Sequence, residues 1–256
     1  MLAAIDVGNT NTVVGFFEGE RLVTQFRLAS HQTSTSDEVA CLLDGLMRMR
    51  HLDPSGVRAA VLSSVVPPLT RVFAGWAERY LKARPLVVGP DTDTGILNRY
   101  TPAKDVGADR VVNAVAAHAR HPGADLVVVD FGTATTFDAV TAAGEYLGGV
   151  IVPGVTVSLD ALFQRTAKLP RVELTRPATV IGRDTVHSIQ SGAYFGYLSM
   201  VEGLVSRMRG ELAPPVGVLA TGGLATLLCG DSSAIDEVVP DLTLQGLRLI
   251  WERNAR

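Results

Sequence analysis

Two short runs of apolar residues, far apart in the chain, each end at an Asp-x-Gly turn rich in threonine. Leu2 to Ile5 leads into Asp6, and Leu126 to Val129 leads into Asp130. An apolar run of this length that ends at a glycine turn is typical of a buried strand. Two further apolar segments follow each turn, with a second glycine turn between them. Each half of the chain is therefore predicted to open with three consecutive strands.

The two aspartates, at positions 6 and 130, lie 124 positions apart in a chain of 256 residues. That interval is too long for the unit of a solenoid repeat. It predicts two related domains, residues 1–118 and 119–256, with the join near 115–125. It also predicts that a ligand binds in the cleft between them.

Helical periodicity alternates with these strands. Thr35-Ser36-Asp37-Glu38 has the pattern of a capping box, and it predicts a helix whose buried face is Val39, Leu42, Leu43, Leu46 and Met47. Strands are also predicted over 59–66, 86–88 and 216–220, helices from 67, from 109, over 185–208 and over 243–251, and a loop over 89–108. This alternation predicts an α/β fold with mixed sheets.

Composition and charge narrow the classes of function. The net charge is −3 and there is no run of Lys and Arg, so a nucleic-acid partner is not expected. No apolar stretch reaches 18 residues, so no membrane span is expected. The first apolar run also lacks the basic leader of a signal peptide. Cys41 and Cys229 each lie among apolar residues and are predicted to be buried free thiols in the cytoplasm.

The two Asp-x-Gly turns carry the candidate chemistry. Gly8 and Gly132 let the backbone approach a ligand closely, so that backbone N–H groups can surround a phosphate together with the hydroxyls of Thr10, Thr12, Thr133 and Thr135. Asp6 and Asp130 are suited to a hydrated Mg²⁺ that bridges phosphate oxygens. One such turn is weak evidence, but two at equivalent places predict that a polyphosphate is held from both sides.

Other signatures are weaker or absent. Gly222-Gly223 follows an apolar strand and is either a shelf for adenosine or a tight strand-to-helix turn. No glycines are spaced as i and i+2, no Gly-Lys-Ser/Thr loop occurs and no Gly-x-Ser-x-Gly elbow occurs. His118 and His121 need no metal-binding role near the end of a helix.

The repeated strand-Asp-Gly-Thr unit followed by Gly-Gly resembles the acetate and sugar kinase/Hsc70/actin superfamily of ATPases. The chain is more specifically similar to the type III pantothenate kinases. The motifs that carry this resemblance occur in the expected order over nearly the full length, and they are residues 6–12 (DVGNTNT), 107–110 (GADR), 130–136 (DFGTATT), 148–154 (GGVIVPG) and 242–247 (LTLQGL).

The resemblance implies two ribonuclease-H-like (actin-like ATPase) domains with ATP in the cleft between them. It implies the ATP-dependent phosphorylation of pantothenate to 4′-phosphopantothenate, the first step of coenzyme A synthesis. A homodimer, Mg²⁺ and a monovalent cation, K⁺ or NH₄⁺, are implied as well. The ATP-binding residues would be Asp6, Val7, Gly8, Asn9, Thr10, Asn11, Thr12, Val13 and Thr133. Asp130 would belong to the cation site, and the pantothenate-binding residues would be Tyr100, Gly107, Ala108, Asp109, Arg110 and Thr185.

The same resemblance implies that Asp109 is the general base. From the residues alone, Asp109 could equally be an N-cap or a first-turn carboxylate, and the helix N-terminus would keep it ionised. Arg110 could pair with the substrate carboxylate, with the transferring phosphate, or simply lie on the helix surface. Tyr100 could be a loop anchor and Thr185 an N-cap.

Gly192, Ala193, Gly196 and Gly203 place small residues along the helix predicted over 185–208. They allow close contact with another helix, so this helix is predicted to form the dimer face, although a buried helix within the chain would look the same. Two other functions stay open. One is a kinase of the same superfamily with another small substrate, and the other is a non-catalytic accessory factor for transcription.

Overall fold

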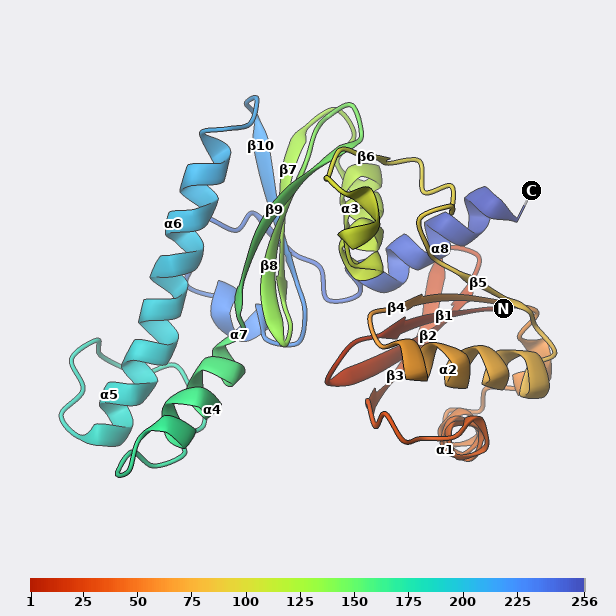
Figure 1. Cartoon of the computed structure of the whole chain (residues 1–256), viewed down its shortest axis with the longest axis horizontal. Helices are drawn as coiled ribbons and strands as arrows, with labels where there is room; N and C mark the ends of the chain where they lie inside the picture. The colour runs from red at the N-terminus through yellow and green to blue at the C-terminus, as the bar shows by residue number, and fades with distance from the viewer. Residues whose placement is uncertain (256) are drawn as a thin grey trace. The chain divides into compact units, whose positions relative to one another are not determined.

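A computed structural model describes residues 1–255, and the chain divides into two compact units (Figure 1). Unit 1 is Met1–Ala116 together with the segment that begins at Leu242, and unit 2 is Ala117–Asp241. Each contains a mixed β-sheet with helices packed on it, as the α/β prediction requires. The division differs from the predicted 119–256 half, because the closing helix groups with unit 1.

Unit 1 is built on a five-stranded sheet with the order β3-β2-β1-β4-β5. β1 pairs antiparallel with β2 and parallel with β4. The carboxyl ends of β1 and β4 therefore lie at the same edge of the sheet. The strands are β1 (Leu2–Val7), β2 (Asn11–Glu18), β3 (Arg21–Ala29), β4 (Ala59–Ser64) and β5 (Pro85–Val87).

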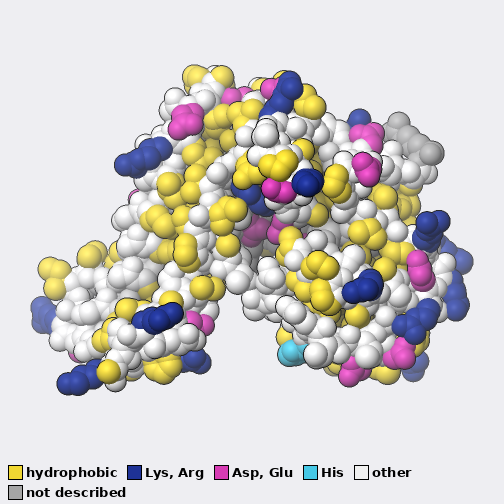
Figure 2. Space-filling model, in the orientation of Figure 1, with side chains coloured by type: hydrophobic (Ala, Val, Ile, Leu, Met, Phe, Trp, Pro, Cys, Tyr) yellow, Lys and Arg dark blue, Asp and Glu magenta, His cyan; other side chains and the backbone are white. Residues whose placement is uncertain are grey.

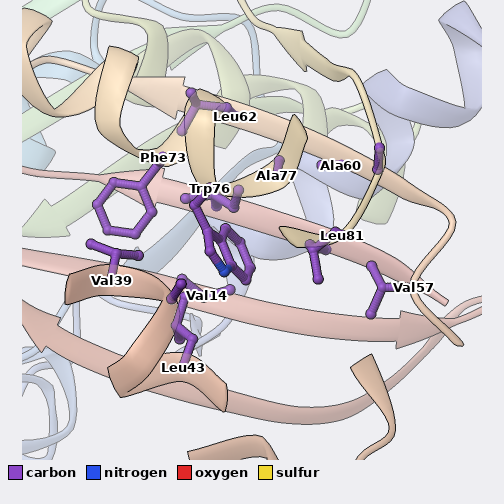
Figure 3. Close-up of a cluster of buried hydrophobic side chains, with 14 of the residues drawn as sticks. Val14, Val39, Leu43, Val57, Ala60, Leu62, Phe73, Trp76, Ala77 and Leu81 are labelled. Atoms are coloured by element: carbon purple, nitrogen blue, oxygen red, sulfur yellow. The ribbon is translucent and has the colours of Figure 1, made fainter. Parts of the chain in front are cut away.

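One face of this sheet is covered by α1 (Ser36–Met49) and α2 (Pro67–Tyr80). Thr35 caps α1 with the predicted capping box, and two prolines occupy the first turn of α2. Figure 3 shows Trp76 and Phe73 of α2 beside Leu43 of α1 in the core over the strands. The predicted α1 face is wrong at Leu42, which is 57% exposed.

The opposite face carries α8 (Leu242–Asn254) and the first part of α3 (Ala108–Arg120). In Figure 1, α8 at the blue end of the chain lies against β1 at its red beginning. A Cβ atom on Gly246 of α8 would collide with the carbonyl oxygen of Val112 in α3, so glycine permits this close helix contact. Between β5 and α3 the chain forms β6 (Leu97–Asn98) and a 3₁₀ turn, Ala103–Asp105, within the predicted loop.

Unit 2 repeats the pattern with strands in the order β11-β10-β7-β8-β9. β7 pairs antiparallel with β8 and parallel with β10, as β1 does with β2 and β4. Its strands are β7 (Asp125–Phe131), β8 (Ala134–Val140), β9 (Glu145–Pro153), β10 (Val216–Thr221) and β11 (Glu237–Val238).

The helices of unit 2 are α4 (Val155–Arg165), α5 (Thr185–Ser191), α6 (Tyr197–Arg209) and α7 (Ala225–Cys229). The single helix predicted over 185–208 is interrupted by a π-helical turn, Gly192–Gly196. The added residue per turn shifts the faces of α5 and α6 relative to each other. The buried residues of α6 include Tyr197, Val201 and Val205.

The prediction for the two thiols is half right. Cys229 is buried, and burial raises the pKa of its thiol to about 11. Cys41, in contrast, is exposed on α1. Both are free. None of the helices in residues 1–255 has the length and apolar character needed to cross a membrane.

Candidate functional site

The first candidate site lies at the carboxyl ends of β1 and β4 in unit 1. Asp6 pairs with Ser63 in the parallel register of these strands. The fully buried Ser63 hydroxyl donates a hydrogen bond of 2.6 Å to Asp6 Oδ1. This edge is where open α/β sheets bind ligands.

The turn after Asp6 is held by its own backbone. The Gly8 N–H donates to the carbonyl oxygen of Asn11 at 3.0 Å, and Asn9 and Thr10 are exposed. Thr12 is fully buried, and its hydroxyl lies 2.9 Å from Ser30 Oγ. The exposed part of the turn available to a phosphate is therefore Gly8 to Thr10, while Thr12 points inward.

The Gly-Ala-Asp-Arg motif forms the start of α3 in the same unit. Asp109 lies in the first turn, where its Oδ1 accepts a hydrogen bond of 2.8 Å from the Arg110 N–H. A Cβ atom on Gly107 would lie 2.5 Å from the same carboxylate oxygen, so a larger residue there would displace Asp109. Arg110 is only 7% exposed. The first-turn position predicted for Asp109 is confirmed.

Burial sets the electrostatics of these two carboxyl groups. It raises the pKa of Asp6 to about 6; the Ser63 hydrogen bond opposes this, and the charge of Asp109 adds to it. Burial also raises the pKa of Asp109, although backbone N–H groups at the helix start pull the other way. Desolvation outweighs the helix end, so the pKa of Asp109 is raised and not lowered.

The second candidate site lies at the equivalent edge of the sheet in unit 2. Asp130 near the end of β7 pairs in register with Thr221 of β10. Gly222 follows with a φ of +94°, and a Cβ atom there would lie 2.5 Å from Asp130 Oδ1. Gly222 therefore allows the backbone after β10 to touch the Asp130 carboxylate. Gly223 beside it is exposed.

The turn after Asp130 is also fixed by backbone bonds. The Gly132 N–H donates to the carbonyl oxygen of Ala134 at 3.1 Å, and the Gly154 N–H to that of Thr133 at 3.0 Å. Thr135 is 1% exposed, and its Oγ1 lies 2.6 Å from the hydroxyl of Tyr197 in α6. As in the first turn, the second hydroxyl residue points inward and Thr133 stays exposed.

The two remaining predicted residues lie in less regular segments. Tyr100 is half-buried, and its N–H donates to Asn98 Oδ1 at 2.9 Å. Thr185 is the first residue of α5, whereas the N-cap is Asp184, which accepts from the His187 N–H at 2.9 Å. Thr185 lines a cavity of about 770 Å³ in unit 2, together with Arg183 and Tyr197. The N-cap reading of Thr185 is therefore wrong.

In unit 1 the charge of Asp109 acts on Asp6, and in unit 2 Asp130 lies against Gly222. Sequence reasoning missed Ser63, which bonds to Asp6. The available signal was the pair Ser63-Ser64 that ends a buried strand, at the edge where the carboxylate of the parallel strand also ends.

The residues of unit 1 suit a Mg²⁺ ion that keeps most of its waters better than a metal ion bound directly by several side chains. Residues 1–255 contain no group of three His, Cys, Asp or Glu side chains that could hold a metal ion. Mg²⁺ that accompanies phosphates keeps several waters and takes one or two carboxylates. The Asp6 carboxylate, with Ser63 on one oxygen, suits that role.

Comparison with known proteins identifies the family. A relative from Myxococcus xanthus named type III pantothenate kinase is 54% identical over 254 residues and covers 99% of both chains. One of the same name from an Anaeromyxobacter species is 53% identical, covering 99% of this chain and all of its own.

The fold also has distant relatives among solved kinases. An inorganic polyphosphate/ATP-glucomannokinase from an Arthrobacter species superposes with a TM-score of 0.50 at 14% identity, covering 98% of each chain. This likeness agrees with two ribonuclease-H-like domains. The sequence model of the type III pantothenate kinases matches residues 2–207, and the chain belongs to that family.

Proposed function

We propose that this protein transfers the γ-phosphoryl group of ATP to the 4′-hydroxyl of pantothenate, and that it does so in the cytoplasm. The observation that carries the proposal is the proximity of Asp6, on a phosphate-type turn, to Asp109, a buried carboxyl at a helix start. Family membership supports the choice of pantothenate as the phosphate acceptor.

In this reaction the hydroxyl oxygen of pantothenate forms a bond to the γ-phosphorus. The bond between that phosphorus and the oxygen bridging it to the β-phosphate breaks, and ADP leaves with the electron pair. Asp109 accepts the hydroxyl proton. Burial raises the pKa of Asp109, so its carboxylate is a stronger base than an exposed aspartate. Phosphoryl transfer otherwise depends on positioning and charge neutralisation.

The other residues would position the two substrates. Residues 6–13 would bind the ATP phosphates, with the exposed Asn9 and Thr10 at the tip of the turn and Thr133 as a second contact. Gly222 and Gly223 would lie against the adenosine. Tyr100, Thr185 and residues 107–110 would bind pantothenate, where the buried guanidinium of Arg110 suits its carboxylate.

Two cations belong to the proposal. Asp6 would hold a hydrated Mg²⁺, which supplies positive charge to the phosphate oxygens. Asp130 would hold the monovalent cation, K⁺ or NH₄⁺. The support for the second site is the close packing of the Gly222 backbone against the Asp130 carboxylate, which leaves carboxylate and carbonyl oxygens at one place.

A homodimer formed by unit 2 is the last part of the proposal. Cβ atoms on Gly192 and Gly196 would meet nothing within 4 Å, so the small-residue side of this helical segment is open. α4, α5 and the segment between them carry several exposed apolar side chains, seen in Figure 2 as separate yellow groups among polar ones, and they are Val157, Leu162, Phe163, Val180, Ile181 and Val186. A second copy of the chain would cover such a surface.

The test is ADP release by the purified protein with pantothenate, Mg²⁺ and K⁺. The wild type should turn over only when pantothenate is present, and absence of pantothenate-dependent turnover rejects the function. Turnover with a different small alcohol alone would favour another kinase of the superfamily. Asp109→Asn should lower kcat by about 10²-fold or more, as loss of a general base does. A variant that keeps near-wild-type kcat shows that Asp109 is not the base.

A further inference from the structure

A row of paired residues crosses the sheet of unit 1 at the level of Asp6. In the strand register Ser63 pairs with Asp6, Asp6 with Val13, and Val13 with Arg27. Paired residues on neighbouring strands direct their side chains to the same face of a sheet. Arg27 of β3 therefore emerges on the face that carries Asp6, two strands away, or about 10 Å across the sheet.

The charge of Arg27 reaches the candidate site. Its guanidinium lowers the pKa of Asp6, against the larger effects of burial and of Asp109. The hydrophobic residues of β3 that pack under α1 and α2, Phe26 and Leu28, flank Arg27 and point to the opposite face. The alternation along β3 thus fixes which face receives the charge.

Arg27 is exposed, and none of the ion pairs within residues 1–255 includes it. The other arginine of the same strand, Arg21, forms an ion pair of 2.7 Å with Glu18. The row of paired residues places Arg27 on the same face of the sheet as Asp6. An exposed arginine that is not held in an ion pair can contact an anionic ligand.

We propose that Arg27 binds the terminal phosphate of the nucleotide, the group that is transferred. The inference rests on the proposed function. Asp109 next to Asp6 would receive the proton of the acceptor hydroxyl, so the phosphate at the Asp6 turn is the one under attack. Arg27 supplies positive charge there from β3, whereas Ser63 contacts Asp6 from β4, and the planar guanidinium can contact two phosphate oxygens.

The experiment compares Arg27→Gln with Arg21→Gln. The two variants remove one positive charge each from the same strand, and Arg21 lies six residues, about 20 Å, from Arg27. Arg27→Gln should lower kcat/KM for ATP by about 10-fold or more, the usual effect of losing a hydrogen bond to a charged group. Its KM for pantothenate and the inhibition constant of AMP, which lacks the terminal phosphates, should stay within twofold of wild type.

Arg21→Gln should stay within twofold of wild type in all these constants, and Arg27→Lys should recover part of the loss. If Arg27→Gln matches Arg21→Gln while the wild type is active, Arg27 does not bind the nucleotide. If Arg27→Gln regains wild-type kcat/KM at pH 8.5, Arg27 acts only by keeping Asp6 ionised, and the proposal is again overturned. An inactive wild type would instead reject the proposed function itself.

Discussion

The Asp-x-Gly turns of unit 1 and unit 2 have the same place in their sheets but differ in length. The strand pair that closes the first turn is Val7 with Thr12, and four residues lie between them. The second turn is closed by Phe131 with Thr135, and three residues lie between them. In space, Thr12 therefore corresponds to Thr135, although the 124-residue repeat aligns it with Thr136.

The two rows also differ in charge. In the sheet of unit 2, Asp130 pairs with Thr136 and Thr136 pairs with Ile151. Ile151 therefore has the position in that row of paired residues that Arg27 has in the row of Asp6. A longer turn offers more backbone N–H groups, and the arginine adds a cation. We infer that the first turn receives the phosphate that reacts. The second turn is shorter and has no charged residue at the matching place in its row.

The largest expected effect is the difference between Asp6→Asn and Asp130→Asn. Asp6→Asn should lower kcat/KM by 10²-fold or more in K⁺ and in Na⁺ alike, because it removes the charge beside the reacting phosphate. Asp130→Asn should instead remove the difference between the K⁺ and Na⁺ rates. Steady-state assays in each salt measure both. An Asp130→Asn enzyme that still prefers K⁺ would show that the monovalent cation binds elsewhere.

The same Asp6→Asn variant should be more stable than the wild type when no ligand is bound. The pKa of Asp6 is about 6 in the folded protein, against 3.8 for an unperturbed aspartate, so the folded state favours the neutral carboxyl. Ionisation then costs the wild type stability as the pH rises from about 4 through 6, up to about 3 kcal/mol. Asparagine does not ionise and still accepts from Ser63.

Urea unfolding at pH 4, 6 and 7.5 measures this gain, which should be smallest at pH 4 and on the order of 3 kcal/mol at pH 7.5. Asp53→Asn is the control, since Asp53 is exposed and Ser55 lowers the pKa of its carboxyl. It should show no gain. A gain for Asp6→Asn that is equal at all three pH values would contradict the role of burial.

Features that depend on residues close together in the chain can be predicted from the sequence. The capping box at Thr35 is local, and its two hydrogen bonds with Glu38 form as predicted. The two Asp-x-Gly turns are local too, and each is closed by a backbone hydrogen bond from its glycine to a residue two or three positions later. In both cases residues within four positions of each other determine the geometry.

Features that depend on distant residues were not predicted. The grouping of α8 with unit 1 depends on Gly246 meeting Val112, more than 130 positions away. The helix predicted over 185–208 is interrupted by a π turn, which the apolar spacing alone did not reveal. The raised pKa of Asp109 follows from burial by tertiary packing, which no local motif encodes.

The smallest expected effect concerns how the second turn is anchored. The hydroxyl of Tyr197 lies 2.6 Å from Thr135 Oγ1 and 3.1 Å from the carbonyl oxygen of Pro153, and thereby ties the turn to α6. Tyr194 offers a matched control in the preceding π-helical turn. Its hydroxyl lies 3.0 Å from Asp231 Oδ2 and 3.3 Å from the carbonyl oxygen of Leu227.

Tyr197→Phe and Tyr194→Phe should each lower the free energy of unfolding by about 1 kcal/mol, because each removes one hydrogen-bonding hydroxyl from the interior. Only Tyr197→Phe should also raise the KM for ATP and the K⁺ concentration for half-maximal rate, by roughly threefold each, an effect of less than 1 kcal/mol. Thermal unfolding and K⁺ titrations of the two variants measure this difference. Equal kinetic constants in the two variants would mean that the second turn keeps its shape without Tyr197, and that its short length alone is sufficient to position Asp130.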